Sequence, residues 1–309
     1  MEASKSIRFQ EIKSCNACGA DASESKVLGS RLDKQQGWKP WKKKGVATTV
    51  CQCVKCGLIY ANPLPTLSSL EETYAIDPTE YWNANSLSYD ANKGYFSREV
   101  AKAVELLRLV SPSKSNLRAL DIGAGAGKAM RALMDHNFIV DGIEPIPSFR
   151  EVAIKVNNIN PENIKLSSIE KSQPPKEYYD FITFGAVLEH LQNPLDSLLK
   201  AYEALAPGGI MHAEVPNANW LIARIADITY RLRITHYTTH LSPLHSPFHL
   251  YEFTDRSLVA LAKRLGLEIA SLEFLVCSQP NMPSIVQPLL RRIMHRTNSG
   301  MQISVFLRK

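Results

Sequence analysis

The chain has 309 residues, of which 45% are hydrophobic, and a formal net charge of +6. This length suits one large domain or a medium domain with an appendage, and the apolar fraction can fill a core. No stretch approaches the roughly 18 consecutive apolar residues of a membrane-spanning helix. The first 13 residues are polar and lack a secretory signal, so we expect a soluble, cytoplasmic protein without a membrane span.

Cysteines are concentrated near the start of the chain, where five of the six lie within the first 56 residues. Four of them form two Cys-x-x-Cys-Gly repeats, and these are Cys15, Cys18, Cys53 and Cys56. Each repeat brings two thiolates to one ion, so the pair predicts a closed tetrahedral site for structural Zn²⁺ in a zinc ribbon over residues 1–62. The alternatives are unligated thiols or a redox pair. Cys51 is either a spare thiol or a replacement for one of the four ligands.

A basic segment with two tryptophans separates the two cysteine repeats. Its residues are Trp38, Lys39, Trp41, Lys42, Lys43 and Lys44. Such a run is usually a solvated loop, and the alternative is a surface that binds an anionic partner. An anionic partner of this kind would fit a phosphorylated substrate.

Residues 63–112 are expected to form a linker and a cap rich in aromatic residues. The rings belong to Tyr74, Tyr81, Trp82, Tyr89, Tyr95 and Phe96. They suit a cap over the mouth of a pocket, and ordinary core packing is the alternative for each ring. A helix is expected from Ser97 to Val110, because its apolar residues recur on one face.

Residues 113–309 have the alternating strand and helix pattern of a doubly wound α/β sheet. Strands are expected at 117–122, 138–144, 164–168, 179–184, 210–215, 267–275 and 302–307. Helices are expected between the first five strands. The clearest one runs from Pro194 to Leu205, with Asn193 as its N-cap. Between the last two strands only residues 287–295 favour a helix.

An insertion at residues 217–248 contains an amphipathic stretch from Trp220 to Leu232. Its apolar residues recur at helical spacing, so we expect a helix whose apolar side faces the core. The alternatives are a cap over the acceptor site and a surface that docks on a membrane or a lipid-linked substrate.

A glycine-rich loop follows the first strand of the sheet. Glycines occupy positions 123, 125 and 127, whereas the dinucleotide fingerprint would require a further glycine where this chain has Lys128. Glycine permits a positive φ and the close approach of a ligand, and the helix that starts at Lys128 directs its partly positive end at the crevice. Glu144 ends the second strand, where its carboxylate can accept both hydroxyls of a ribose. The alternative is a tight turn beside a solvated Glu144.

These motifs together resemble the class I S-adenosylmethionine-dependent methyltransferases. The resemblance implies a seven-stranded, Rossmann-like sheet whose final strand is antiparallel, and S-adenosylmethionine as the cofactor. The residues that it assigns to cofactor binding are Asp121, Gly123, Gly125, Gly127, Glu144, Pro145, Ile169, Glu170, Phe184 and Gly185.

The cysteine repeats, the dipeptide Asn62-Pro63 and the segment from His249 to Thr254 resemble a zinc-ribbon branch of this family. That branch includes sugar C-methyltransferases and methyltransferases of polysaccharide or secondary-metabolite pathways. The resemblance implies a small-molecule acceptor, such as a sugar or a nucleotide-linked sugar. The basic segment would suit a phosphorylated acceptor, and nucleic acid is not expected as a partner. The sugar C-methyltransferases are generally longer, so the exact chemistry is not implied.

Histidines are the candidates for catalysis, because methyl transfer to a hydroxyl or an acidic carbon is helped by a general base with a pKa near the working pH. His190 follows the fourth strand at the edge where ligands bind, and the resemblance places His249 among the substrate contacts. His245 is a further candidate. The alternative for each is a hydrogen-bonded structural histidine.

Two other functions stay open at this point. The chain could be a non-catalytic module whose zinc ribbon binds nucleic acid or protein. It could also be an oxidoreductase with a nucleotide cofactor, which Lys128 disfavours because it replaces a glycine of the dinucleotide fingerprint.

Overall fold

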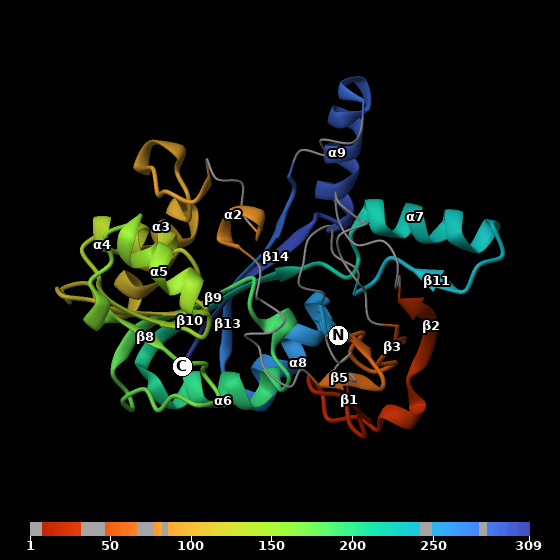
Figure 1. The fold of residues 1–309 in the computed structure, drawn as a ribbon, viewed down its shortest axis with the longest axis horizontal. Helices are drawn as coiled ribbons and strands as arrows, with labels where there is room; N and C mark the ends of the chain where they lie inside the picture. The colour runs from red at the N-terminus through yellow and green to blue at the C-terminus, as the bar shows by residue number, and fades with distance from the viewer. Residues whose placement is uncertain (1–7, 32–46, 67–76, 82–85, 242–248, 278–282) are drawn as a thin grey trace, which may run out of the picture.

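The computed structural model in Figure 1 describes residues 8–31, 47–66, 77–81, 86–241, 249–277 and 283–309. The basic segment between the cysteine repeats, the rings of Tyr74, Tyr81 and Trp82, and His245 lie outside the described part. No helix in the described part is long and apolar enough to cross a membrane.

A seven-stranded mixed sheet forms the centre of the fold (Figure 1). Its strands are β6 (Arg118–Ile122), β7 (Ile139–Glu144), β8 (Ile164–Leu166), β9 (Tyr179–Gly185), β10 (Leu205–Pro216), β13 (Glu268–Leu275) and β14 (Gln302–Arg308). They are arranged in the order β13-β14-β10-β9-β6-β7-β8, and β14 is antiparallel to both of its neighbours. The predicted α/β fold, its seven strands and the antiparallel final strand are confirmed. The start of β10 at Leu205 rather than 210 is the largest difference in bounds.

Helices cover both faces of this sheet. The α-helices in the described part are α2 (Pro78–Tyr81), α3 (Ser97–Val110), α4 (Lys128–Asp135), α5 (Pro147–Lys155), α6 (Pro194–Ala204), α7 (Leu221–Leu232), α8 (Asp255–Leu265) and α9 (Gln287–Thr297). The short 3-10 helices are η1 (Ala22–Glu24), η4 (Ala91–Lys93), η5 (Pro161–Asn163), η6 (Leu188–His190) and η7 (Ser284–Val286). Successive strand residues such as Ala119 and Leu120 belong to different core clusters, as the two-residue period of a strand requires. Helices α3, α4 and α5 pack in one cluster, and α6 and α8 pack in the other.

The helix predictions are confirmed in part. Helix α3 has the predicted bounds, and the Asn193 side chain accepts a hydrogen bond at the start of α6. The helix expected between β8 and β9 is absent from the described residues 167–178. Pro174 and Pro175 interrupt this connection, and proline both lacks an amide donor and disfavours a helical residue before it.

Helix α8 was not predicted, although the sequence carries its boundary signals. Thr254 and Ser257 form a reciprocal capping box at its start, and Gly266 has the left-handed conformation at its end. A capping search in the segment before the sixth strand would have found it.

The cysteine-rich segment is joined to the rest of the chain by a second sheet. The cysteine-rich segment contributes β2 (Lys26–Arg31), β3 (Thr49–Gln52) and β4 (Ile59–Ala61) to this sheet. Strands β11 (Tyr237–Thr238) and β12 (Tyr251–Glu252) complete it in the order β11-β2-β3-β4-β12. Strands β1 (Arg8–Gln10) and β5 (Leu64–Thr66) pair with each other in a separate antiparallel sheet. The buried residues of the cysteine-rich segment belong to the same core cluster as α6 and α8. The segment therefore folds against the central sheet and shares its core.

Helix α7 corrects one expectation about the insertion. It occupies the predicted amphipathic stretch, but none of its residues is buried, and Ile228 and Leu232 are 54% and 78% exposed. Figure 1 shows α7 projecting away from the helices that cover the central sheet. Its Asp227 side chain accepts hydrogen bonds from Thr238 and Thr239, which tie it to β11. The prediction of a core-facing helix is wrong, because periodicity shows that a helix has an apolar side and does not show what covers that side.

Candidate functional site

A cavity of about 360 Å³ opens at the carboxyl ends of β6, β7, β9 and β10. This is the edge where open α/β sheets bind ligands. Of the residues predicted to bind a cofactor, the lining contains Asp121, Gly123, Gly125, Glu144, Pro145, Ile169, Glu170 and Gly185. Phe184 and Gly127 are not among the lining residues, because Phe184 is fully buried in the core and Gly127 is the N-cap of α4.

The glycine loop is shaped by close packing as well as by access to the cavity. Gly127 has φ +73°, and a Cβ atom there would lie 2.9 Å from the side chains of Ala153 and Ile159. Gly127 therefore allows α4 to start against α5. Gly125 has a positive φ and donates its amide to the Glu144 carboxylate at 2.7 Å. The loop is thus held to the end of β7 at the floor of the cavity.

Two buried carboxylates face the cavity. Glu144 is 3% exposed and accepts hydrogen bonds from the amides of Gly125 and Ile146, so it is not a solvated strand end. Burial raises the pKa of Glu144 to about 7, against the effect of these two hydrogen bonds. Asp121 is 3% exposed, and its Oδ2 has no hydrogen-bond partner in the described part of the chain. Burial and the neighbouring Glu144 raise the pKa of Asp121 to about 7. This pair suits a ligand that brings hydroxyl donors and a positive charge.

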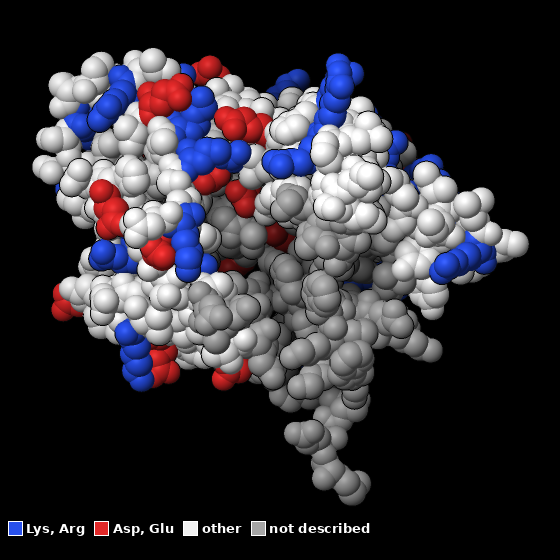
Figure 2. Space-filling model, turned by 90° about the horizontal axis from the view of Figure 1, so that it is seen from above, with Lys and Arg blue, Asp and Glu red and all other residues white. Residues whose placement is uncertain are grey.

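The rest of the lining contains Tyr95 and Phe96, two of the rings expected in the cap. It also contains four residues that sequence analysis missed, which are Glu99, Ser168, Thr183 and Glu214. Burial and the neighbouring Glu99 raise the pKa of Glu214 to about 7. Figure 2 shows acidic side chains in and around the hollow on this face of the molecule. Alternation along β10 could have indicated Glu214, because a glutamate within an apolar strand needs a polar environment.

His190 and His249 come together beside this cavity. His190 ends η6 and lines the cavity, and its ring centroid lies 5.0 Å from that of His249. A backbone hydrogen bond of 2.8 Å from Leu250 N to Glu189 O holds the two segments together. Glu189 is 1% exposed, and burial raises its pKa to about 8. Sequence analysis did not single out Glu189.

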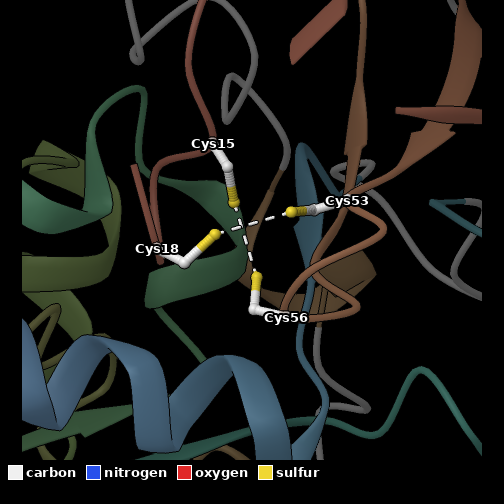
Figure 3. Close-up of side chains that lie close together, drawn as sticks. All are labelled: Cys15, Cys18, Cys53 and Cys56. Atoms are coloured by element: carbon white, nitrogen blue, oxygen red, sulfur yellow. Dashed lines mark hydrogen bonds between the residues drawn. The ribbon is translucent and has the colours of Figure 1, made fainter. Parts of the chain in front are cut away.

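The four cysteines of the two repeats form a second centre (Figure 3). Distances of 3.5 Å separate the sulfur atoms of Cys15 and Cys56 and those of Cys18 and Cys53. Sulfur atoms bound to one Zn²⁺ at about 2.3 Å stand roughly 3.8 Å apart, whereas a disulfide requires about 2.05 Å. The geometry therefore fits a tetrahedral zinc site and not a disulfide. Cys51 lies on β3 and is not part of this group.

The fold and the glycine loop define a doubly wound domain built to hold a nucleoside-containing ligand. Residues 94–272 match the family described as Methyltransferase domain. The match covers more than half of the chain, so this protein belongs to that family.

Curated relatives are similar over parts of their length. The ubiquinone biosynthesis O-methyltransferase of Rickettsia bellii is 28% identical over 160 residues, which cover 50% of this chain and 65% of the relative. The mitochondrial ubiquinone biosynthesis O-methyltransferase of Schizosaccharomyces pombe is 32% identical over 134 residues, with coverages of 41% and 48%. The tRNA U34 carboxymethyltransferase of Shewanella loihica is 35% identical over 105 residues, with coverages of 32% and 31%. The chain thus spans less than two thirds of these relatives. The relative named for tRNA does not support the expectation that nucleic acid is an unlikely partner.

A solved S-adenosylmethionine-dependent methyltransferase from Mesorhizobium loti is also similar. It is 17% identical, with a TM-score of 0.46, over 66% of this chain and 95% of that chain.

Replacement of Glu144 tests the floor of the cavity. Glu144→Gln should weaken S-adenosylhomocysteine binding by about tenfold or more, because it removes a charged hydrogen-bond acceptor. Isothermal titration calorimetry measures the change. The matched control is Glu151→Gln on the exposed side of α5. Equal affinity in the two variants would remove Glu144 from the binding site.

Ligand binding should release protons at pH 7. Without ligand, Asp121 and Glu144 have pKa values of about 7, and a ligand with an ammonium group and ribose hydroxyls favours their ionised forms. The affinity for this ligand should therefore increase as the pH rises through about 7, and it should be weaker at lower pH. Calorimetry in two buffers of different ionisation enthalpy measures the protons released, and equal heats in both buffers would contradict the coupling.

The same shifts act in the opposite direction on the stability of the unliganded protein. The folded-state pKa values exceed the ordinary values of about 4, so the folded protein binds these protons more tightly than the unfolded chain does. Their contribution to stability is present below pH 4 and is lost as the pH rises through about 7.

The ligand set of the cysteine centre can be tested with cobalt. Cobalt-substituted protein should show sulfur-to-metal charge-transfer absorption, and Cys53→Ser should reduce this absorption while Cys51→Ser leaves it unchanged. The reason is that Cys53 lies within the sulfur cluster and Cys51 does not. The opposite result would exchange the roles of these two cysteines.

Proposed function

We propose that this protein is an S-adenosylmethionine-dependent methyltransferase. The acceptor is a small molecule that offers a hydroxyl group or an acidic carbon, such as a sugar or a nucleotide-linked sugar. The observation that carries this proposal is the buried pair Asp121 and Glu144 beside a glycine loop, at the edge of the sheet where nucleotides bind. Membership of the methyltransferase family supports the cofactor.

The cofactor would use the floor of the cavity. In this arrangement Glu144 accepts the two ribose hydroxyls and Asp121 faces the positively charged part of the methionine moiety. The start of α4 accepts the methionine carboxylate, because a helix N-terminus presents unpaired amides and a partial positive charge. Ile169 and Glu170 flank the adenine.

The composition of the lining favours an acceptor rich in hydroxyl groups. The carboxylates that line the cavity are Glu99, Asp121, Glu144, Glu170 and Glu214, and the one lysine in the lining is Lys128. Carboxylates accept hydrogen bonds from hydroxyls and repel phosphate. A phosphorylated acceptor would therefore need to keep its phosphate outside this part of the cavity. RNA also carries phosphates, so we place it second, after a sugar, as the acceptor. The similarity to a tRNA carboxymethyltransferase is the observation that keeps RNA as a candidate.

The reaction is a displacement at the methyl carbon. The acceptor loses its proton, its oxygen or carbon forms the new bond to the methyl group, and the bond from methyl to sulfur breaks so that the sulfonium becomes a thioether. The protein aligns the three atoms in a cavity that limits access of water. We propose that His190 and His249 promote the loss of the acceptor proton, which passes to solvent.

The two centres have separate roles. The cysteine centre is proposed to hold structural Zn²⁺ through Cys15, Cys18, Cys53 and Cys56. All four positions around such an ion would be occupied by sulfur, so its contribution would be to the fold.

Turnover assays test this function and the role of His190. Radiolabelled S-adenosylmethionine offered with a panel of sugars, nucleotide-linked sugars and tRNA should label a sugar-containing acceptor. His190→Ala should lower kcat by about 100-fold or more and leave the affinity for S-adenosylhomocysteine within about twofold.

The matched control is His136→Ala, which should keep full turnover. The ring of His136 contacts the carbonyl of Ala132 at the end of α4, away from the cavity. Full turnover by His190→Ala would exclude its proposed role. Absence of S-adenosylhomocysteine binding by the folded protein would overturn the methyltransferase proposal and favour a non-catalytic module.

A further inference from the structure

Glu189, His190 and His249 form a compact group, here the Glu-His-His cluster, beside the cavity that His190 lines. We propose that this cluster binds a divalent transition-metal cation, such as Zn²⁺, Fe²⁺ or Mn²⁺, with open coordination positions directed at the acceptor. The role in methyl transfer rests on the proposed function, whereas binding of the cation does not.

The first observation is the convergence of three ligand atoms from two parts of the chain. One carboxylate oxygen and one nitrogen of each ring all lie within 4.8 Å of one another. Ligands that bind a metal at about 2.1 Å stand roughly 3 to 4 Å apart, so small side-chain rotations would complete the site. The backbone bond from Leu250 N to Glu189 O fixes the two segments at this spacing.

The second observation is that two of these side chains have buried atoms without partners. Glu189 Oε2 and His249 Nδ1 have no hydrogen-bond partner in the described part of the chain. Glu189 is 1% exposed and His249 is 7% exposed. A buried polar atom without a partner is unfavourable, and a cation would pair the free oxygen of Glu189 by direct coordination. His249 Nδ1 lies near the carboxylate of Glu252 instead.

The surroundings of His249 suit a metal ligand. Its Nδ1 lies 3.9 Å from Glu252 Oε1. Glu252 is itself fixed, since it accepts hydrogen bonds from His240 Nδ1 at 2.6 Å and from the amide of Leu241 at 2.7 Å. A slight rotation would let Nδ1–H donate to Glu252 and leave Nε2 for the metal. A carboxylate that orients a ligating histidine in this way is a common feature of metal sites.

The donor set indicates the class of cation. One carboxylate and two imidazoles suit first-row transition metals and zinc better than Mg²⁺ or Ca²⁺, which prefer oxygen ligands. Three protein ligands leave positions for an exchangeable ligand, unlike the cysteine centre with its four sulfurs. His190 lines the cavity, so a cation bound to its ring would lie beside the space proposed for the acceptor.

Such a cation would explain how the two histidines promote deprotonation. A hydroxyl group bound to a divalent metal has a lowered pKa. Its O–H bond breaks and the proton passes to solvent, the oxygen attacks the methyl carbon, and the electron pair of the broken C–S bond returns to sulfur. The histidines then act as ligands, and no further reactant is needed.

Cobalt(II) added to the zinc-loaded full-length protein tests the site without any acceptor. We expect one equivalent to bind with the visible absorption of nitrogen and oxygen ligands and without a sulfur charge-transfer band. Glu189→Gln and His249→Ala should each weaken this binding by at least about tenfold. Glu203→Gln and His136→Ala, which change the same residue types away from the cavity, should retain it.

X-ray absorption of the cobalt-loaded wild-type protein gives a readout that needs no variant. The expected result is a shell of nitrogen and oxygen atoms with imidazole scattering and no sulfur. A cobalt spectrum with sulfur ligands alone, or a nitrogen and oxygen centre that persists in both cluster variants, would overturn the proposal.

Calorimetry separates failure of this proposal from failure of the proposed function. Binding of S-adenosylhomocysteine without a nitrogen and oxygen cobalt centre would reject the cation and leave the methyltransferase proposal standing. Cobalt at the cluster without S-adenosylhomocysteine binding would support the cation site and reject the cofactor.

Discussion

One short segment, residues 249–254, holds the parts of this protein in their relative positions. The amide of Leu250 donates to the carbonyl of Glu189, and its own carbonyl accepts from the amide of Ala61. Five residues after His249, Thr254 donates its hydroxyl to the carbonyl of Cys56 and caps α8. The segment therefore connects the loop after β9, the sheet of the cysteine-rich segment and helix α8. Buried backbone groups must be paired, so these bonds fix His249 beside His190, which lines the cavity.

The cysteine centre is tied to the helices on one face of the central sheet. Asn16, inside the first cysteine repeat, donates its amide to Asn193 at the start of α6, and Arg264 of α8 donates to the carbonyl of Asn16. A metal held by the four sulfurs would stiffen the loops that receive these bonds. The cysteine-rich segment thus packs against α6 and α8 and shares their core.

The site concentrates carboxylates that are costly to bury. Asp121, Glu144 and Glu214 all have pKa values raised by burial. A fold that retains such groups loses stability in their ionised state, and a ligand of opposite charge or with hydroxyl donors recovers it. Electrostatics therefore link ligand binding, proton release and stability at this edge of the sheet.

The sequence by itself determined the features that depend on neighbours along the chain. Runs of apolar residues located the seven strands, glycine spacing located the loop at Gly125, and the two repeats identified the four cysteines, because periodicity and backbone conformation are local properties. The sequence also predicted the apolar side of α7, but it did not show that this side is exposed.

Only the tertiary structure decided which distant residues meet. It removed Phe184 and Gly127 from the cavity lining, added Glu99 and Glu214, and set Glu189 beside His249. It also built one sheet from β2, β3 and β4 together with β11 and β12. These pairings span up to about two hundred residues, and they depend on strand order, burial and backbone pairing across the whole fold, which a local pattern does not encode.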